Sequence, residues 1–224
     1  MTIIRDFVER DSAIVEMCRN KSVLHLGCVG FTDCPIDEKV RQARASLHTQ
    51  LTDVASSCTG VDLDGQAITE LKDHGVFDNI VEGDVEHLEK LPADMADYDV
   101  VVAGDIIEHL SNPGLMLDGI RGRLGANGVL IVSTPNAFGI ASWIRVLLGK
   151  FKEGEQHVIC FNPTTLEQLL KRHGYSITYL ATCHQSRAIH NYGLWFRIFR
   201  YILRTLPRHG GTLLCVCKPE HRSV

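Results

Sequence analysis

The 224-residue sequence lacks several features that would define a functional class at once. It has 8 cysteines but no C-x-x-C pair, and its 11 histidines show no compact spacing typical of a zinc or magnesium site. We therefore predict that no metal is required. We also predict buried, reduced thiols at the cysteines that fall in or beside apparent strands, which are Cys28, Cys58, Cys160, Cys183, Cys215 and Cys217.

Long hydrophobic runs and excess positive charge are also missing. No apolar stretch approaches the roughly 18–20 residues that span a bilayer, and residues 1–10 mix charged and apolar side chains unlike a signal peptide. A net charge of -4 gives no general attraction to phosphate. These absences predict a cytoplasmic protein that binds no nucleic acid, with peripheral contact at the inner membrane surface left open.

The hydrophobic pattern predicts alternating strands and helices in one domain covering residues 1–224. Short apolar runs bounded by turn residues predict seven strands, at 22–26, 59–63, 79–81, 99–103, 128–133, 176–181 and 212–217. Apolar residues spaced three and four apart predict helices at 3–18, 47–55, 65–74, 114–124 and 163–173. The alternation predicts a mostly parallel α/β sheet with helices on both faces, and the last two strands are expected to form an antiparallel edge.

Two glycines, Gly27 and Gly30, follow the first strand. Glycine lets a backbone turn sharply and approach a ligand without a Cβ clash, so a nucleotide-like ligand could rest here. A Gly-x-x-Gly turn is weak evidence on its own, because a simple tight turn has the same pattern.

Carboxylates end the next two strands. Asp62 is placed to accept hydrogen bonds from a ribose diol, while Asp64 is expected to cap the following helix. After the third strand, Asp84 could accept from an adenine amino group and Val85 could flank the ring, although a loop carboxylate without a ligand is the simpler alternative. Three such turns at the carboxyl ends of successive strands predict a ligand crevice.

Three further segments carry a family resemblance. The sequence resembles the class I S-adenosylmethionine (SAM)-dependent methyltransferases. Besides the three turns, the resemblance rests on residues 98–110 (YDVVVAGDIIEHL), 128–136 (GVLIVSTPN) and 157–161 (HVICF). Ubiquinone-biosynthesis-type enzymes and bacterial small-molecule and glycan methyltransferases form the branch in question. The resemblance covers about residues 22–175 and resumes at the final strand. It implies a Rossmann-like fold, SAM as cofactor and S-adenosylhomocysteine as product.

The resemblance also implies positions for the cofactor. The turn from Gly27 to Gly30 would support the methionine part of SAM, Asp62 the ribose, Asp84 and Val85 the adenine, and 103–105 the amino acid end. The full set of expected cofactor contacts is Gly27, Cys28, Val29, Gly30, Asp62, Leu63, Gly83, Asp84, Val85, Ala103, Gly104 and Asp105.

Two positions depart from the family pattern. His25 stands where an acidic residue is common, and Val29 stands where glycine is common. His25 either replaces the acid in a different hydrogen-bond network or is a strand histidine satisfied by neighbouring backbone. The departures keep open a second interpretation, a non-catalytic partner or regulatory subunit with the same fold. An NAD-dependent oxidoreductase is disfavoured because the G-x-G-x-x-G spacing is missing.

Methyl transfer from a sulfonium is an in-line displacement, so positioning the acceptor can supply much of the catalysis. A hydroxyl acceptor also benefits from proton removal, for which His109 and His157 are the main candidates and Glu108 a weaker one. Each could instead hold a loop in place. The acceptor could be a small molecule, a glycan or a lipid-linked intermediate, and the methylated atom could be O, N or C. Only the resemblance favours oxygen.

Three insertions, at about 31–46, 137–156 and 183–210, are expected at the ligand edge as a substrate-side cap, the first of them as a lid. Within the last, residues 193–208 place arginines opposite apolar side chains, and 138–152 form a second amphipathic stretch. Such helices could pack on the domain, form a homodimer interface or lie on a membrane surface.

Overall fold

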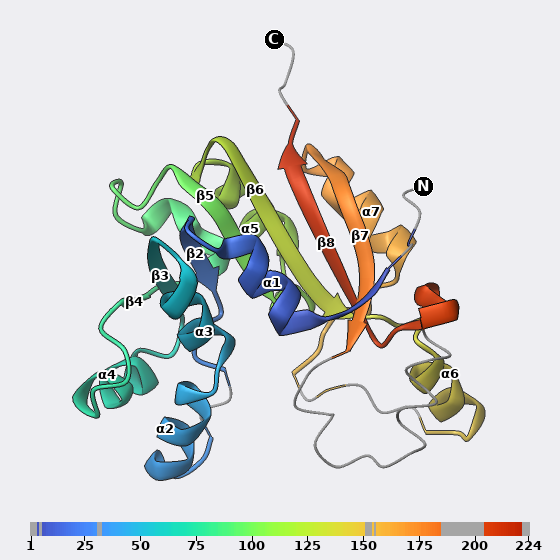
Figure 1. The fold of residues 1–224 in the computed structure, drawn as a ribbon, viewed down its shortest axis with the longest axis horizontal. Coiled ribbons are helices and arrows are strands. Elements are labelled where there is room, and N and C mark those ends of the chain that lie inside the picture. The colour runs from blue at the N-terminus through green and yellow to red at the C-terminus, as the bar shows by residue number, and fades with distance from the viewer. Residues whose placement is uncertain are drawn as a thin grey trace. The chain divides into compact units, whose positions relative to one another are not determined.

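The computed structural model describes residues 4, 6–30, 33–150, 154, 156–184 and 204–220. The chain separates into two compact units (Figure 1). The first unit comprises Met1–Ile14, Asp105–Ser111 and Ile131–Val224, and the second comprises Val15–Gly104 and Asn112–Leu130. Strand β6 (Leu124–Pro135) contributes residues to both units.

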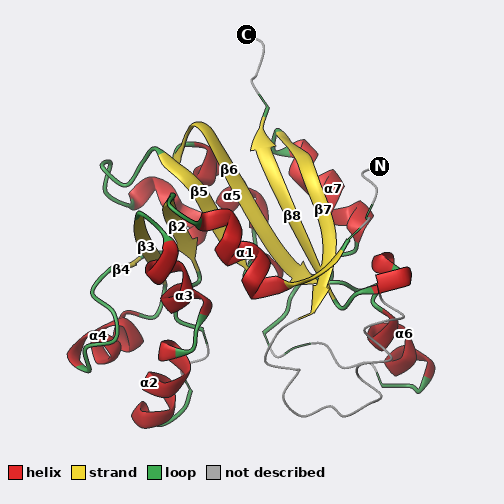
Figure 2. Ribbon diagram, in the orientation of Figure 1, coloured by secondary structure: helices red, strands yellow, loops and turns green. Residues whose placement is uncertain are grey.

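In the second unit, parallel strands follow the order β5-β2-β3-β4 (Figure 2). Their bounds are Ser22–Leu26 for β2, Ser57–Asp62 for β3, Ile80–Glu82 for β4 and Tyr98–Gly104 for β5. Strands β2 and β5 are continuous apolar runs that are almost wholly buried, as expected for parallel strands covered on both faces. The register pairs Leu26 with Val61 and with Ala103, so these strands end at the same edge.

Helices and 3₁₀ turns follow these strands. They are α2 (Ile36–Arg44), α3 (Leu47–Val54), α4 (Gly65–Asp73), α5 (Pro113–Arg121) and the 3₁₀ helix η1 (Val85–Lys90). The first insertion forms α2, which packs against α4 because Ala43 joins a buried cluster with Leu71 and Phe77. Lys39 of α2 also pairs with Glu70 of α4. A lid role for this segment stays a prediction, while α2 itself is part of the core of its unit.

The first unit contains β1 (Phe7–Glu9), β7 (Tyr175–His184), β8 (Thr212–Pro219) and the end of β6, in the order β1-β7-β8-β6. The predicted antiparallel pairing of the last two strands is confirmed, but β1 pairs parallel with β7 beyond them. The prediction of one helix over 3–18 is therefore wrong at its start. Phe7–Glu9 form an eighth strand because they hydrogen-bond to β7, and α1 begins only at Arg10 and ends at Cys18.

Helix α7 (Pro163–Arg172) confirms its sequence signals. Asn162 and Thr165 form a capping box, Pro163 opens the helix, and Gly174 follows it with a left-handed φ of 71°. The described residues also include α6 (Ile140–Leu147) and the 3₁₀ helices η2 (Ile107–His109) and η4 (Pro207–His209). No described helix is both long and apolar enough to cross a membrane.

One sequence prediction is wrong, and another falls mostly outside the described residues. Cys160 is exposed rather than buried because it lies in the loop segment before α7, outside any strand. Most of the predicted amphipathic helix over 193–208 lies outside the described residues, which resume at Arg204.

Arg123 holds together the segment after η1. Its guanidinium is buried and donates to the backbone carbonyls of Leu88, Pro92, Leu91 and Met95. We predict that Arg123→Met lowers the free energy of unfolding by about 3 kcal/mol, because the buried carbonyls lose their donors. Urea denaturation checks this, with Arg19→Met at an exposed ion pair as the control. A loss equal to that of the control would contradict it.

Candidate functional site

The turn after β2 has the backbone that its glycines predict. Gly27 and Gly30 have left-handed φ values of 67° and 78°, which other residues adopt only at a cost. The N–H of Gly27 donates to the carbonyl of Val61 at 2.8 Å, which continues the pairing with β3 into the turn. The loop between the two glycines is therefore fixed relative to the end of β3.

Asp62 ties this loop to the second strand. Its Oδ2 accepts from the backbone N–H of Val29 at 2.8 Å, and its Oδ1 accepts from the N–H of Asp64 at 3.2 Å. Each carboxylate oxygen has a second lone pair, so the group can still accept from a diol. Asp64 caps α4 by accepting from the N–H of Ala67, which confirms the cap assigned from the sequence.

The turn after β4 is also constrained. Gly83 donates to the carbonyl of Asp62 at 2.8 Å, and a Cβ on Gly83 would lie 2.6 Å from Leu91. Asp84 caps η1 by accepting from Glu86 N–H at 2.9 Å, so its carboxylate has a structural task beside any ligand. Val85 is buried, whereas Leu63 is 70% exposed. Leu63 is thus the apolar side chain that a planar ring could cover.

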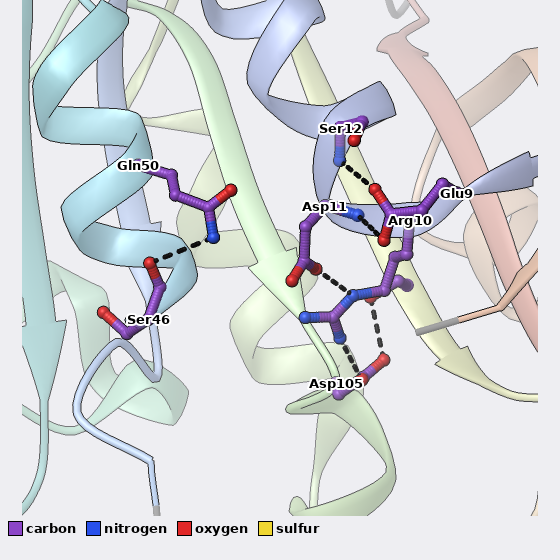
Figure 3. A network of polar contacts seen from close by, with 8 residues as sticks. Glu9, Arg10, Asp11, Ser12, Ser46, Gln50 and Asp105 are labelled. Carbon is purple, nitrogen blue, oxygen red and sulfur yellow. Dashed lines mark hydrogen bonds and ion pairs between the residues drawn. The ribbon is translucent and has the colours of Figure 1, made fainter. Parts of the chain in front are cut away.

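Asp105 directly follows β5 and belongs to the first unit, and Figure 3 shows its carboxylate beside Arg10. Its backbone is left-handed, with φ of 52°, and its carboxylate accepts from Ser133 Oγ at 2.8 Å and pairs with Arg10. Burial acts against the charge of Arg10, but the nearby carboxylates of Asp105 and Asp11 raise its pKa. Sequence reasoning missed Arg10, since the predicted helix over 3–18 gave it no special place.

Glu108 is the most buried carboxylate of the site, with 1% of its surface exposed. Its Oε2 accepts from Thr134 Oγ1 at 2.9 Å, and its Oε1 has no hydrogen-bond partner within the described part of the chain. Burial, reinforced by the charge of Asp105, raises the pKa of Glu108 to about 7. A buried carboxyl oxygen without a partner is costly, so it indicates a functional role.

His109 and His157 meet beside Glu108. The two rings pack edge to face with centroids 4.7 Å apart, and burial and the neighbouring ring lower the pKa of His109. Ligand-type atoms of these two histidines and Glu108 all lie within 4.8 Å of one another. The structure thus brings together the three residues that the sequence proposed for catalysis, in a geometry that could hold a cation or relay a proton.

A small pocket of the first unit opens at this cluster. Glu108 and His157 line it together with Thr134, Asn136, Ser142, Arg145, Cys160 and other residues. Arg145 and Ser142 come from α6, and Arg145 donates to Ser142 Oγ at 3.1 Å. Sequence reasoning placed Arg145 in an amphipathic stretch but did not connect it to the catalytic residues, because that connection depends on tertiary packing.

His25 belongs to a buried side-chain network in the second unit. Its Nδ1 lies 3.3 Å from Nδ1 of His48, whose Nε2 lies 3.3 Å from Asn79 Oδ1. Asn79 donates its amide N–H groups to Cys58 O and Thr52 Oγ1, so its oxygen faces His48 as an acceptor. It follows that His48 carries its proton on Nε2 and accepts from His25 at Nδ1. His25 thus takes part in a side-chain network, and its replacement of the acidic residue stays a prediction.

The fold and these turns define the class of protein: an α/β domain with ligand-type turns at the carboxyl ends of parallel strands. A family model described as a methyltransferase domain matches residues 38–180, which is more than half of the chain. The chain belongs to this family of methyltransferase domains. The family description agrees with the sequence resemblance, which implies S-adenosylmethionine as cofactor.

Particular relatives are distant. The mitochondrial ubiquinone biosynthesis O-methyltransferase of Schizosaccharomyces pombe is 24% identical over 160 residues, which cover 67% of this chain and 50% of that protein. The chain thus spans about half the length of this curated relative. A SAM-dependent methyltransferase from Thermotoga maritima, described as a possible histamine N-methyltransferase, has 14% identity and a TM-score of 0.60 over 94% of this chain and 87% of that one.

A third relative was solved with the reaction product bound. The magnesium protoporphyrin IX methyltransferase of Synechocystis, with bound S-adenosylhomocysteine, has 13% identity and a TM-score of 0.55, over 94% of this chain and 82% of that chain. At such identities the likeness establishes the fold alone. These similarities confirm the Rossmann-like α/β prediction and leave the acceptor to be inferred from the site.

The histidine pair predicts a dependence of stability on pH. Burial lowers the pKa of His48, and a second proton on it would set two N–H groups against each other. At this site the unfolded chain, with a histidine pKa of about 6.5, binds more protons than the folded one, so the contribution of the histidine pair to stability falls as pH drops below about 6.5. Glu108, whose pKa is raised, contributes in the opposite direction. The half-buried thiol of Cys58, with its pKa raised to about 11, stays neutral in this range.

We predict that His48→Gln flattens this dependence in urea titrations between pH 7.5 and 5, by at most about 1.4 kcal/mol per unit of pKa shift removed. His74→Gln, at an exposed helix end, is the matched control and should keep the wild-type slope. Equal slopes for wild type and His48→Gln would contradict the assignment.

Proposed function

We propose that this chain transfers the methyl group of SAM to an oxygen atom of an acceptor bound at Glu108, His109 and His157. The observation that carries the proposal is the unpartnered, buried Oε1 of Glu108 in a cluster with two histidines. A hydroxyl acceptor must lose its proton as the new bond forms, and this cluster offers a place for that proton. Amine and carbon acceptors also lose a proton, so the choice of oxygen follows the sequence resemblance.

The same observation weighs against a non-catalytic partner subunit. A purely structural domain gains nothing from burying a carboxyl oxygen without a hydrogen bond, which costs about 1–3 kcal/mol. Such groups persist where function requires them. The retained turn chemistry at Gly27, Asp62 and Gly83 points the same way.

The cofactor contacts follow from the second unit. We propose that the turn from Gly27 to Gly30 supports the methionine part of SAM and that Asp62 accepts from the ribose hydroxyls. Adenine then lies near Leu63, Asp84 and Val85. The exposed side chain of Leu63 supports this placement, since it offers an apolar surface beside the ribose carboxylate.

In this proposal, Ala103, Gly104 and Asp105 contact the amino acid end of SAM. Asp105 is held by Arg10 and Ser133, so its carboxylate has a fixed position. Arg10 is accordingly a positioning residue for Asp105.

The reaction itself is a single displacement. The acceptor oxygen attacks the methyl carbon, the carbon-sulfur bond breaks, and its electron pair stays on the sulfur of S-adenosylhomocysteine. Orientation of the reactants can supply about 7–11 kcal/mol of the barrier reduction, and proton removal a further 10²–10⁴-fold in rate. Thr134 orients Glu108 for this second contribution.

The acceptor is proposed to be amphiphilic and lipid-linked. Helix α6 has no buried residue, and Trp143 and Leu147 are 53% and 79% exposed. From Asn136 to Lys152 the only charged side chains are Arg145, Lys150 and Lys152, although the whole chain is net negative. An apolar helix flanked by cations fits the surface of an anionic bilayer, and Arg145 also lines the pocket.

The acceptor proposal is tested with methyl-labelled SAM and paired probes that carry the same alkyl tail on a phenol or on an aniline. We predict methylation of the phenol, and at least a 100-fold lower kcat for Glu108→Gln with the Kd for SAM unchanged within threefold. Preferred methylation of the aniline, or full activity of Glu108→Gln, would contradict it.

The membrane proposal is tested by sedimentation with vesicles containing 30% phosphatidylglycerol. We predict that the double variant Leu147→Ser, Leu148→Ser loses at least three quarters of the bound fraction, whereas Leu115→Ser, an exposed leucine of α5, does not. Unchanged binding of the double variant, or a shift from dimer to monomer without vesicle binding, would favour a protein partner instead.

A further inference from the structure

Three side chains of the first unit form a set of metal-type donors. Glu108 and His109 come from η2, and His157 comes from the segment before α7. One ligand atom of each lies within 4.8 Å of the others. The spacing along the sequence shows no metal motif, because tertiary packing brings His157 back to η2.

The carboxylate is oriented as a ligand would be. Thr134 donates to Oε2 of Glu108 at 2.9 Å, which fixes the group while Oε1 is left without a partner in the described residues. The side chain is 1% exposed and lines the pocket, so only a molecule or ion held inside the pocket can supply the missing partner. A cation would satisfy this oxygen directly.

A backbone contact fixes the ring of His109. The ring of His109 hydrogen-bonds to the backbone of Gln156, whose φ of 70° is left-handed. A metal-binding histidine typically donates its second ring N–H to such a carbonyl, which fixes the ring and its tautomer. This contact is an independent sign that His109 presents its other nitrogen to a ligand.

His157 is held through its neighbours. The N–H groups of Val158 and Ile159 both donate to the carbonyl of Glu108, at 2.9 and 3.2 Å. A Cβ on Gly154 would lie 2.6 Å from the His157 ring, so only glycine leaves room for the ring there. Backbone contacts therefore fix His157 next to η2.

We infer that Glu108, His109 and His157 bind a divalent first-row cation such as Mn²⁺, Co²⁺ or Zn²⁺. Two imidazoles and one carboxylate on one side of an ion suit these metals better than Ca²⁺ or Mg²⁺, and they leave coordination positions open. Donors bound at about 2.1 Å lie about 3.0–3.4 Å apart, so small rotations of the rings complete the site. The pocket beside Glu108 and His157 gives an acceptor access to the open positions.

This inference rests on the proposed function and deepens it. The acceptor hydroxyl binds the cation, which lowers the pKa of the hydroxyl so that its proton passes to water. The oxygen then forms the bond to the methyl carbon, and the carbon-sulfur bond breaks as before. With a cation bound, Glu108 would serve as a ligand, and the cation would take over the part in proton loss that the metal-free cluster has in the proposed function.

The direct test is Mn²⁺ binding to untagged, EDTA-treated protein, followed by electron paramagnetic resonance of the free ion and by calorimetry with Mn²⁺, Co²⁺ and Zn²⁺. We expect one site per chain, with affinity at least tenfold weaker in Glu108→Gln and in His157→Gln. His87→Gln is the matched control, because His87 pairs with Glu89 at 3.2 Å in the second unit and should keep wild-type binding. Gly154→Ala, which displaces the His157 ring without removing a donor, should also weaken binding.

Folding of each variant is checked by its SAM affinity, which these substitutions should leave unchanged. No saturable site below about 1 mM for any of the three ions in folded wild type, or equal binding by wild type and Glu108→Gln, would overturn the inference. Saturable binding without methylation of the phenol probe would leave the cation site standing and refute the proposed acceptor. Full activity in excess EDTA would show that the cluster works without a metal.

Discussion

The hydrogen bond from the Val29 N–H to the carboxylate of Asp62, 2.8 Å long, is the contact on which the cofactor side of the chain depends. It joins the glycine turn after β2 to the end of β3, and Gly83 then joins the turn after β4 to the same residue. Asp62 thereby holds three segments, two through its carboxylate and one through its backbone carbonyl, and the carboxylate still has lone pairs for a ribose. These contacts are possible because the parallel register of β2, β3 and β5 ends the strands at one edge of the sheet.

In the first unit, the carboxylates of Asp105 and Glu108 have different surroundings. Asp105 has Arg10 and Ser133 as partners. Glu108, buried and with only one carboxyl oxygen hydrogen-bonded, has a pKa raised to about 7, and the neighbouring charge of Asp105 contributes to that rise. A carboxylic acid whose pKa lies near neutrality is typical of catalytic sites. The histidines add nitrogen donors to the less solvated member of the pair.

Local signals predicted those parts of the structure that local interactions determine. Helix α7, the Asp64 cap and the largely apolar strands β2 and β5 needed only a few neighbouring residues. Strand β1 was missed because three residues become a strand only through pairing with β7, distant in sequence. Three contacts could not be predicted for the same reason, because tertiary packing creates them. They are those of His25 with His48, Asp105 with Arg10, and His109 with His157.

The most direct test of the account is isothermal titration of the folded chain with SAM and S-adenosylhomocysteine, for wild type, Asp62→Ala and Asp64→Ala. The account predicts micromolar binding by wild type and at least a tenfold loss in Asp62→Ala, which gives up both the ribose acceptor and the link to Val29. Asp64→Ala, which removes only a helix cap, should bind within threefold of wild type while losing about 1 kcal/mol of stability. Absence of binding by folded wild type, or equal binding by Asp62→Ala, would contradict the account.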